Sequence, residues 1–76
     1  MNIARRKNLQ SILARLEELK ESLSALRDEE EEYRDSIPEN LQGSSRYEAA
    51  EEACDNLNYA VDDLESVIDY IRTAAE

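Results

Sequence analysis

The sequence predicts an all-α protein: an antiparallel, coiled-coil-like hairpin of two long helices that dimerises into a four-helix bundle. Apolar residues recur at alternating spacings of three and four in two segments, and neither segment has an interior Gly or Pro. Turn-forming residues separate the segments, so the two helices are expected to lie side by side. We expect a single domain at residues 1–76, with helices at about 2–36 and 45–75 and a loop at 37–44.

The first segment predicts a helix with one apolar seam that only Glu30 interrupts. Pro38 is expected to end this helix, because the residue before a proline is disfavoured in the helical region. The seam consists of Leu9, Ile12, Leu16, Leu19, Leu23, Leu26, Glu30, Tyr33 and Ile37.

The second segment has the same spacing without a polar interruption. Ser45 and Glu48 form the pattern of a capping box, which predicts Ser45 as the residue that caps the helix. The seam consists of Tyr47, Ala50, Cys54, Leu57, Val61, Leu64, Ile68, Ile71 and Ala75.

A turn centred near Gly43 sets the expected register, in which Leu23 faces Leu64. Charged residues beside the two seams agree with this pairing, since opposite charges fall at the same level. The expected ion pairs are Lys20–Glu65 and Arg34–Glu51.

Helix 2 is expected to have an apolar face wider than one partner helix can cover. One interpretation is a weakly apolar flank that stays in solvent. The other is a second packing surface that joins two hairpins, which the marginal size of a 76-residue chain favours. The expected oligomer interface consists of Leu13, Ala53, Ala60, Val67 and Ala74.

The composition argues against an enzyme and against a metal or cofactor site. The chain has no His, one Gly and one Cys, so it lacks the means for histidine catalysis, a glycine-rich phosphate loop or a disulfide framework. We expect Cys54 to be a buried structural thiol, although a reactive thiol is the alternative. The carboxylate runs at 29–32 and 62–63 lack the spacing of a calcium loop and are expected to be solvated helix surface.

Charge is unevenly distributed along the chain, with six basic and three acidic residues at 1–27 but three basic and sixteen acidic residues at 28–76. The net charge of −10 argues against direct nucleic-acid binding. Arg5, Arg6 and Lys7 are expected to compensate the C-terminal end of helix 2, with contact to an anionic partner as the alternative. They are too few for membrane attachment. An unpaired Cys and the lack of a targeting segment predict a cytoplasmic protein.

The outer face of helix 2 is the candidate partner-binding surface, because tyrosines lie there among carboxylates. This face has three interpretations: a solvated surface, a protein-binding surface with Tyr59 and Tyr70 as anchors, and a mimic of nucleic-acid phosphates. The candidate residues are Asp55, Tyr59, Asp62, Asp63, Asp69 and Tyr70.

The turn I-P-E-N-L-Q-G-S at 37–44, the R-Y-E that follows at 46–48 and the basic A-R-R-K at 4–7 resemble a family of small acidic helical proteins. Phages and prophages of Gram-positive bacteria encode this family. The resemblance implies no catalytic residue or cofactor, but it implies a setting in which short acidic proteins bind host proteins. Some antirestriction and anti-CRISPR inhibitors do so by imitating nucleic acid.

Together these features predict a non-enzymatic protein that binds and modulates or inhibits a host protein. Mimicry directed at a nucleic-acid-binding enzyme is the special case. The alternative is a purely structural oligomerisation module without an external ligand.

Overall fold

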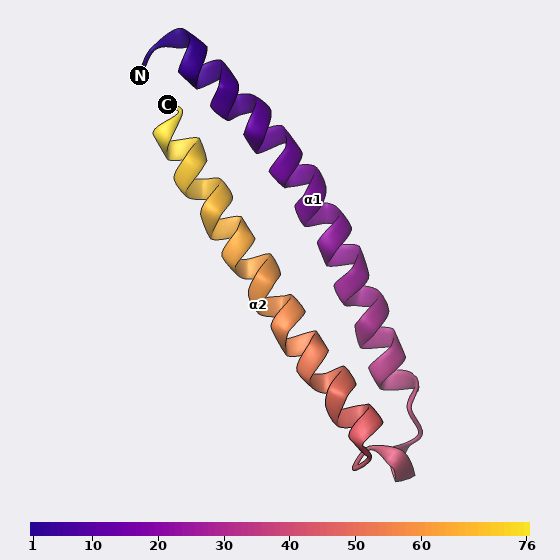
Figure 1. Ribbon diagram of the computed structural model, residues 1–76. Coiled ribbons are helices and arrows are strands. Elements are labelled where there is room, and N and C mark those ends of the chain that lie inside the picture. Colours follow the sequence, from indigo (N-terminus) through magenta and orange to yellow (C-terminus); the bar gives the residue numbers. More distant parts are fainter.

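The protein is all-helical, and its two long helices pack against each other as an antiparallel hairpin (Figure 1). The computed structural model describes residues 1–76. Helix α1 spans Ile3–Ser36, a 3-10 turn η1 spans Glu39–Leu41, and helix α2 spans Ser45–Ala74. The hairpin measures 59 × 15 × 13 Å, so it is a rod, and both termini lie at one end of it (Figure 1).

Local sequence sets both ends of α1. The side chain of Asn2 accepts a hydrogen bond from the backbone N–H of Arg5 at 2.7 Å, which satisfies one of the free donors of the first turn. At the other end Ile37 leaves the helical region with φ −69° and ψ 127°, as expected for the residue before Pro38. The helix therefore stops where the proline requires it to stop.

Ser44 rather than Ser45 caps helix α2. Its backbone is extended, with φ −75° and ψ 159°, and its side chain accepts a hydrogen bond from the backbone N–H of Tyr47 at 3.3 Å. Ser45 is already helical, so the predicted capping box of Ser45 and Glu48 is wrong. Glu48 lies in the first turn, where the helix dipole favours a negative charge.

The core of the hairpin is thin, and four of its six buried residues belong to α2. Helix α1 contributes no buried residue, and each of its seam residues is at least partly exposed. Only six of the 76 residues are buried. They are Ile37, Ala50, Cys54, Val61, Ile68 and Ala75.

Helix α1 is rotated about its axis relative to the predicted packing. Half of its expected seam is exposed, and a neighbouring row that contains Lys20, Arg27 and Arg34 is half-buried instead. The stems of Arg27 and Arg34 provide apolar surface while their guanidinium groups remain bonded to a carboxylate. The exposed half of the seam consists of Ile12, Leu19, Leu26 and Tyr33.

The two predicted interhelical ion pairs do not form, and Arg34 pairs with a local aspartate instead. Arg34 lies 3.0 Å from Asp35, its own neighbour in sequence, and Arg27 lies 3.2 Å from Asp28. The four ion pairs of the chain include neither Lys20–Glu65 nor Arg34–Glu51. The adjacent aspartates are reached without ordering a second long side chain on α2.

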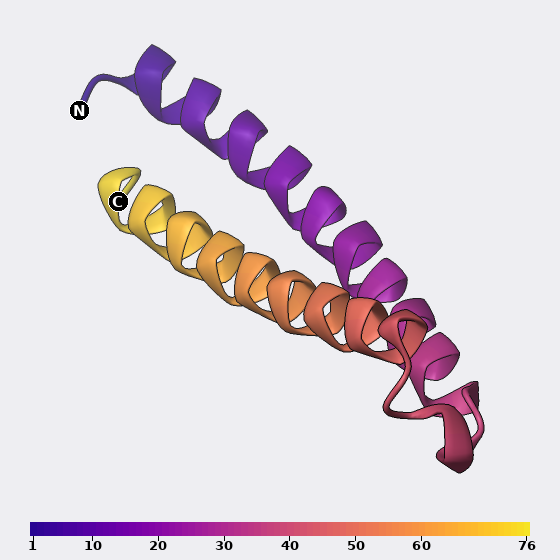
Figure 2. The same ribbon diagram turned by 60° about the horizontal axis from the view of Figure 1, so that its bottom comes forward.

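Figure 2 shows the two helices crossing at a small angle, with α1 separating from α2 toward the termini.

Ile68 is a core residue of α2 with 2% of its surface exposed. We expect Ile68→Ala to lower the free energy of unfolding by about 2–5 kcal/mol, because the substitution removes most of a buried aliphatic side chain and leaves a cavity. Chemical denaturation at fixed protein concentration measures this loss. The control Tyr70→Ala, at a side chain that is 75% exposed, should change stability by less than about 0.5 kcal/mol. Equal losses for the two variants would contradict this account of the core.

Candidate interaction surfaces

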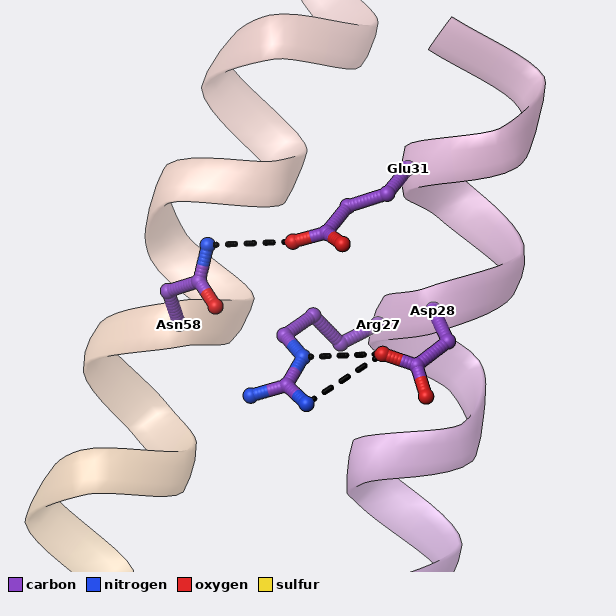
Figure 3. Close-up of polar contacts among 4 residues, drawn as sticks. All are labelled: Arg27, Asp28, Glu31 and Asn58. Carbon is purple, nitrogen blue, oxygen red and sulfur yellow. Dashed lines mark hydrogen bonds and ion pairs between the residues drawn. The ribbon is translucent and has the colours of Figure 1, made fainter. Parts of the chain in front are cut away.

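One flank of the hairpin is polar and joins the helices by side-chain bonds. Arg72 of α2 donates to Glu17 of α1 at 2.7 Å, and Asn58 of α2 donates to Glu31 of α1 at 3.5 Å. Figure 3 shows the Asn58–Glu31 contact across the gap between the helices, with Arg27 beside it. Glu17 directly follows Leu16, and Arg72 directly follows Ile71, which faces Leu16 in the expected register. The residues of the Asn58–Glu31 contact follow such a facing pair in the same way. The contacts agree with this register.

The opposite flank brings the exposed row of α1 beside the outer alanine row of α2. Arg46, at the start of α2, donates a hydrogen bond to the Tyr33 hydroxyl, and its guanidinium carbon lies 5.4 Å from the centre of the Tyr33 ring. Arg46 precedes Ala53 by one heptad, and Tyr33 follows Leu26 by one heptad. The contact therefore shows that the row of α1 that contains Leu26 and the row of α2 that contains Ala53 lie on the same flank. We call them together the apolar stripe: Ile12, Leu19, Leu26 and Tyr33 of α1, and Ala53, Ala60, Val67 and Ala74 of α2.

The apolar stripe is open to solvent along the length of the hairpin. Leu19 is 61% exposed, Leu26 is 56% exposed and Val67 is 43% exposed. Of the four α2 residues predicted for an oligomer interface, Ala53 is half-buried and the other three are exposed. Leu13 is half-buried in the row that faces α2, so it lies outside the stripe.

Sequence reasoning did not assign the α1 half of the stripe to a second surface. Leu19 and Leu26 fit the heptad spacing, which predicts them in the hairpin seam. The heptad spacing gives no signal for this exposure, because α1 carries two apolar rows and one helix-to-helix contact covers about two rows on each helix. The count leaves only the third apolar row of α2 outside the contact.

The six candidate residues on the outer face of α2 are all exposed, and we call them the acidic outer face: Asp55, Tyr59, Asp62, Asp63, Asp69 and Tyr70. Tyr59 is 65% exposed and Tyr70 is 75% exposed. Asp69 is held by Arg72 at 2.9 Å, and this arginine also bonds Glu17 of α1. The other carboxylates of the face, such as Asp62, form no hydrogen bond or ion pair within the chain.

The basic start of α1 reaches the end of α2 through one residue. A terminal nitrogen of Arg6 donates to the backbone carbonyl of Glu76 at 3.3 Å and to that of Met1 at 3.4 Å. This contact places positive charge at the C-terminal end of α2, where the helix dipole favours it. Asp69, the last carboxylate within α2, bonds Arg72 rather than the basic start of α1.

A pocket of about 460 Å³ lies at the hairpin tip, at one end of the apolar stripe. Its walls combine apolar side chains with Arg46, and the hydrogen bond to Tyr33 raises the pKa of Arg46 above its ordinary value. The lining residues are Tyr33, Ser36, Ile37, Pro38, Leu41, Ser44 and Arg46.

Cys54 is fully buried, as its position in the seam predicts. Burial raises the pKa of its thiol above the ordinary 9.0, and the charges of Glu30, Glu31 and Asp35 act in the same direction while Arg34 opposes them.

No group of three His, Cys, Asp or Glu side chains is arranged to hold a metal ion. Neither long helix has a stretch of sufficient length and apolar character to cross a bilayer.

No protein-family model, curated protein or solved structure matches this chain. The resemblance to phage-encoded acidic proteins therefore stays a prediction.

The raised pKa of Cys54 predicts a loss of stability at alkaline pH. The folded state keeps its thiol protonated to higher pH than the unfolded state, so this contribution is complete below pH 9.0 and is lost as pH rises through the folded-state pKa. We expect the free energy of unfolding to fall more steeply above pH 9.0 in the wild type than in Cys54→Ala. Denaturant titrations at several pH values measure the two slopes, and parallel slopes would contradict the prediction.

Proposed function

We propose that this protein is a non-enzymatic interaction module whose working form is a dimeric four-helix bundle. The observation that supports the proposal is the apolar stripe, a row of large side chains exposed along one flank of a rod. Scattered apolar residues are normal on a protein surface, but a contiguous apolar patch marks an interaction site.

The thinness of the hairpin core makes a second copy the best occupant of the stripe. Six buried residues are few for a chain of 76, and small domains without disulfides or metals usually need oligomerisation. Burying a leucine side chain contributes about 1.5–3 kcal/mol relative to leaving it exposed. Covering Leu19 and Leu26 of both copies would thus add stability that the isolated hairpin lacks. Small residues of the stripe, such as Ala60, allow close approach of another helix.

Leu26→Asp tests this dimer. The substitution puts a charge into the proposed interface, where it has no partner, so we expect dimer affinity to fall by at least about 100-fold. Light scattering over a dilution series measures it: the wild type should give a particle of twice the chain mass, and Leu26→Asp a single-chain particle.

Tyr59→Asp is the matched control, because it adds the same charge at an exposed site outside the stripe and should leave the dimer intact. Circular dichroism checks that the helices remain in both variants. A wild-type protein that stays monomeric at high concentration, with its helices formed, would contradict the proposed dimer.

A second function is favoured by the acidic outer face: binding and modulation of a host protein that carries a basic surface. Tyr59 and Tyr70 are exposed among carboxylates that have almost no partners within the chain. Tyrosine is enriched among residues that dominate binding energy, and acidic surroundings favour a basic partner. Asp55, Tyr59, Asp62 and Asp69 lie away from the apolar stripe, so a dimer would leave them free, whereas Asp63 and Tyr70 follow Ala60 and Val67 by three residues and border the stripe.

Nucleic-acid mimicry is the special case of this second function. Duplex DNA carries one charge per about 1.7 Å of its axis, and a helix rises about 1.5 Å per residue, so closely spaced carboxylates along a rod approach such a charge density. The resemblance to acidic phage proteins, among which such inhibitors occur, supports this target class. The partner would be an enzyme that binds DNA or RNA.

Reversing Asp55 and Asp62 to lysine tests the second function, because both lie on the side of the acidic outer face away from the apolar stripe. We expect the double variant to keep the dimer, because both carboxylates are exposed and unpaired, and to lose a nucleic-acid enzyme that the wild type retains from a bacterial lysate at low salt. Elution of that enzyme by a competing polynucleotide would support mimicry, whereas elution by salt alone would support a modulator without mimicry. Equal capture by the wild type and the double variant would contradict a role for this face.

A further inference from the structure

The whole net charge of the protein lies in one half of the rod. Residues 23–64, which we call the tip half, contain three basic and thirteen acidic residues, a net of −10. The remaining residues, 1–22 and 65–76, form the terminal half, which contains six basic and six acidic residues and is neutral. Figure 1 shows that these halves are the two ends of one straight rod.

This polarity distinguishes the two ways in which a second hairpin can pack on the stripe. If both tips point the same way, the two strongly acidic halves lie against each other. If the tips point opposite ways, each acidic half lies against a neutral one. Half of the 59 Å rod is about 30 Å, roughly three times the screening length of about 10 Å at 0.1 M salt, so the opposed arrangement separates the acidic halves effectively.

The α1 part of the stripe is symmetric in a way that suits the opposed arrangement. Leu19 and Leu26 lie on either side of Ser22, and Ile12 and Tyr33 lie one heptad further out. A twofold axis beside Ser22 superposes this row on itself with the chain direction reversed. The small side chain of Ser22 leaves space for the leucines to interdigitate at the axis.

Charges beside the row are also complementary under that axis. Arg15 and Glu29 are each seven residues from Ser22 on the same face of α1, so Arg15 of one copy lies level with the partner's Glu29. Neither residue forms an ion pair within its own hairpin. The symmetry provides two such pairs in each dimer.

The pocket at the hairpin tip adds an independent feature at the end of the row. Tyr33 and Ser36 form part of its wall and also lie on the stripe side of α1. Under the same axis Ile12 of the partner subunit faces Tyr33, so an exposed apolar side chain meets an apolar pocket of about 460 Å³. The second copy of the chain therefore supplies a side chain that can occupy the pocket.

We propose that two copies pack through the apolar stripe in opposite directions, as an antiparallel bundle whose twofold axis crosses α1 beside Ser22. This inference rests on the dimer proposed above and deepens it. The arrangement sets an acidic tip at each end of the assembly, beside the neutral terminal half of the partner.

A charge exchange at constant net charge tests the arrangement. Arg15→Glu combined with Glu29→Arg restores both ion pairs in the opposed bundle with their polarity inverted, so its dimer dissociation constant should equal that of the wild type. Arg15→Glu combined with Glu52→Arg has the same net charge but leaves the introduced carboxylate level with the partner's Glu29. We expect its dimer to be about tenfold weaker at low salt. Sedimentation equilibrium measures all three constants, and equal constants for the two double variants would overturn the inference.

Disulfide trapping gives a second measurement that does not depend on charge. In a Cys54→Ala background, Ser22→Cys places two thiols at the proposed axis, and mild oxidation should link the dimer covalently. Ser66→Cys, on the outer surface of α2, should give no linked dimer. A dimer by light scattering without a Ser22→Cys link would overturn the antiparallel arrangement alone, whereas a monomer would overturn the proposed dimer as well.

Discussion

The structure depends on a mismatch between the number of apolar rows and the surface that two helices can cover. Helix α2 carries three such rows and α1 carries two, but one helix pair buries only the rows that face each other. The hairpin resolves this by burying the centre of α2 and rotating α1, so that Leu19 and Leu26 are exposed. The α2 half of the stripe follows from that constraint, and the rotation of α1 adds Leu19 and Leu26 to the open surface that the proposed second copy would cover.

Polar contacts determine which flank is closed and which stays open. Arg72 and Asn58 reach across to Glu17 and Glu31 on one side. The other side has only the contact of Arg46 with Tyr33 at the tip. The two sides therefore differ in chemistry. Side-chain hydrogen bonds join the helices on the first side, and the second side presents apolar surface along most of the rod.

Much of the fold was predictable from the sequence, because heptad spacing and a proline-containing turn act locally. The cap of α2 was predicted one residue too late, since the sequence offers two adjacent serines and only backbone geometry selects Ser44. The rotation of α1 was not predictable from spacing. It depends on the stems of Arg27 and Arg34 packing as apolar surface, whereas a heptad pattern counts arginine as polar. The exposure of the acidic outer face was predictable from the sequence, because its residues lie outside the apolar seam of α2.

The central claim, that the stripe is a buried interface in the assembled protein, is tested most directly by methyl NMR with a soluble paramagnetic probe. Signals of Leu19 and Leu26 should be protected from the probe in concentrated samples and should broaden on dilution. Ile3, which is 70% exposed and lies off the stripe, should broaden at every concentration. Leucine signals that broaden as strongly as that of Ile3 at all concentrations would contradict the account.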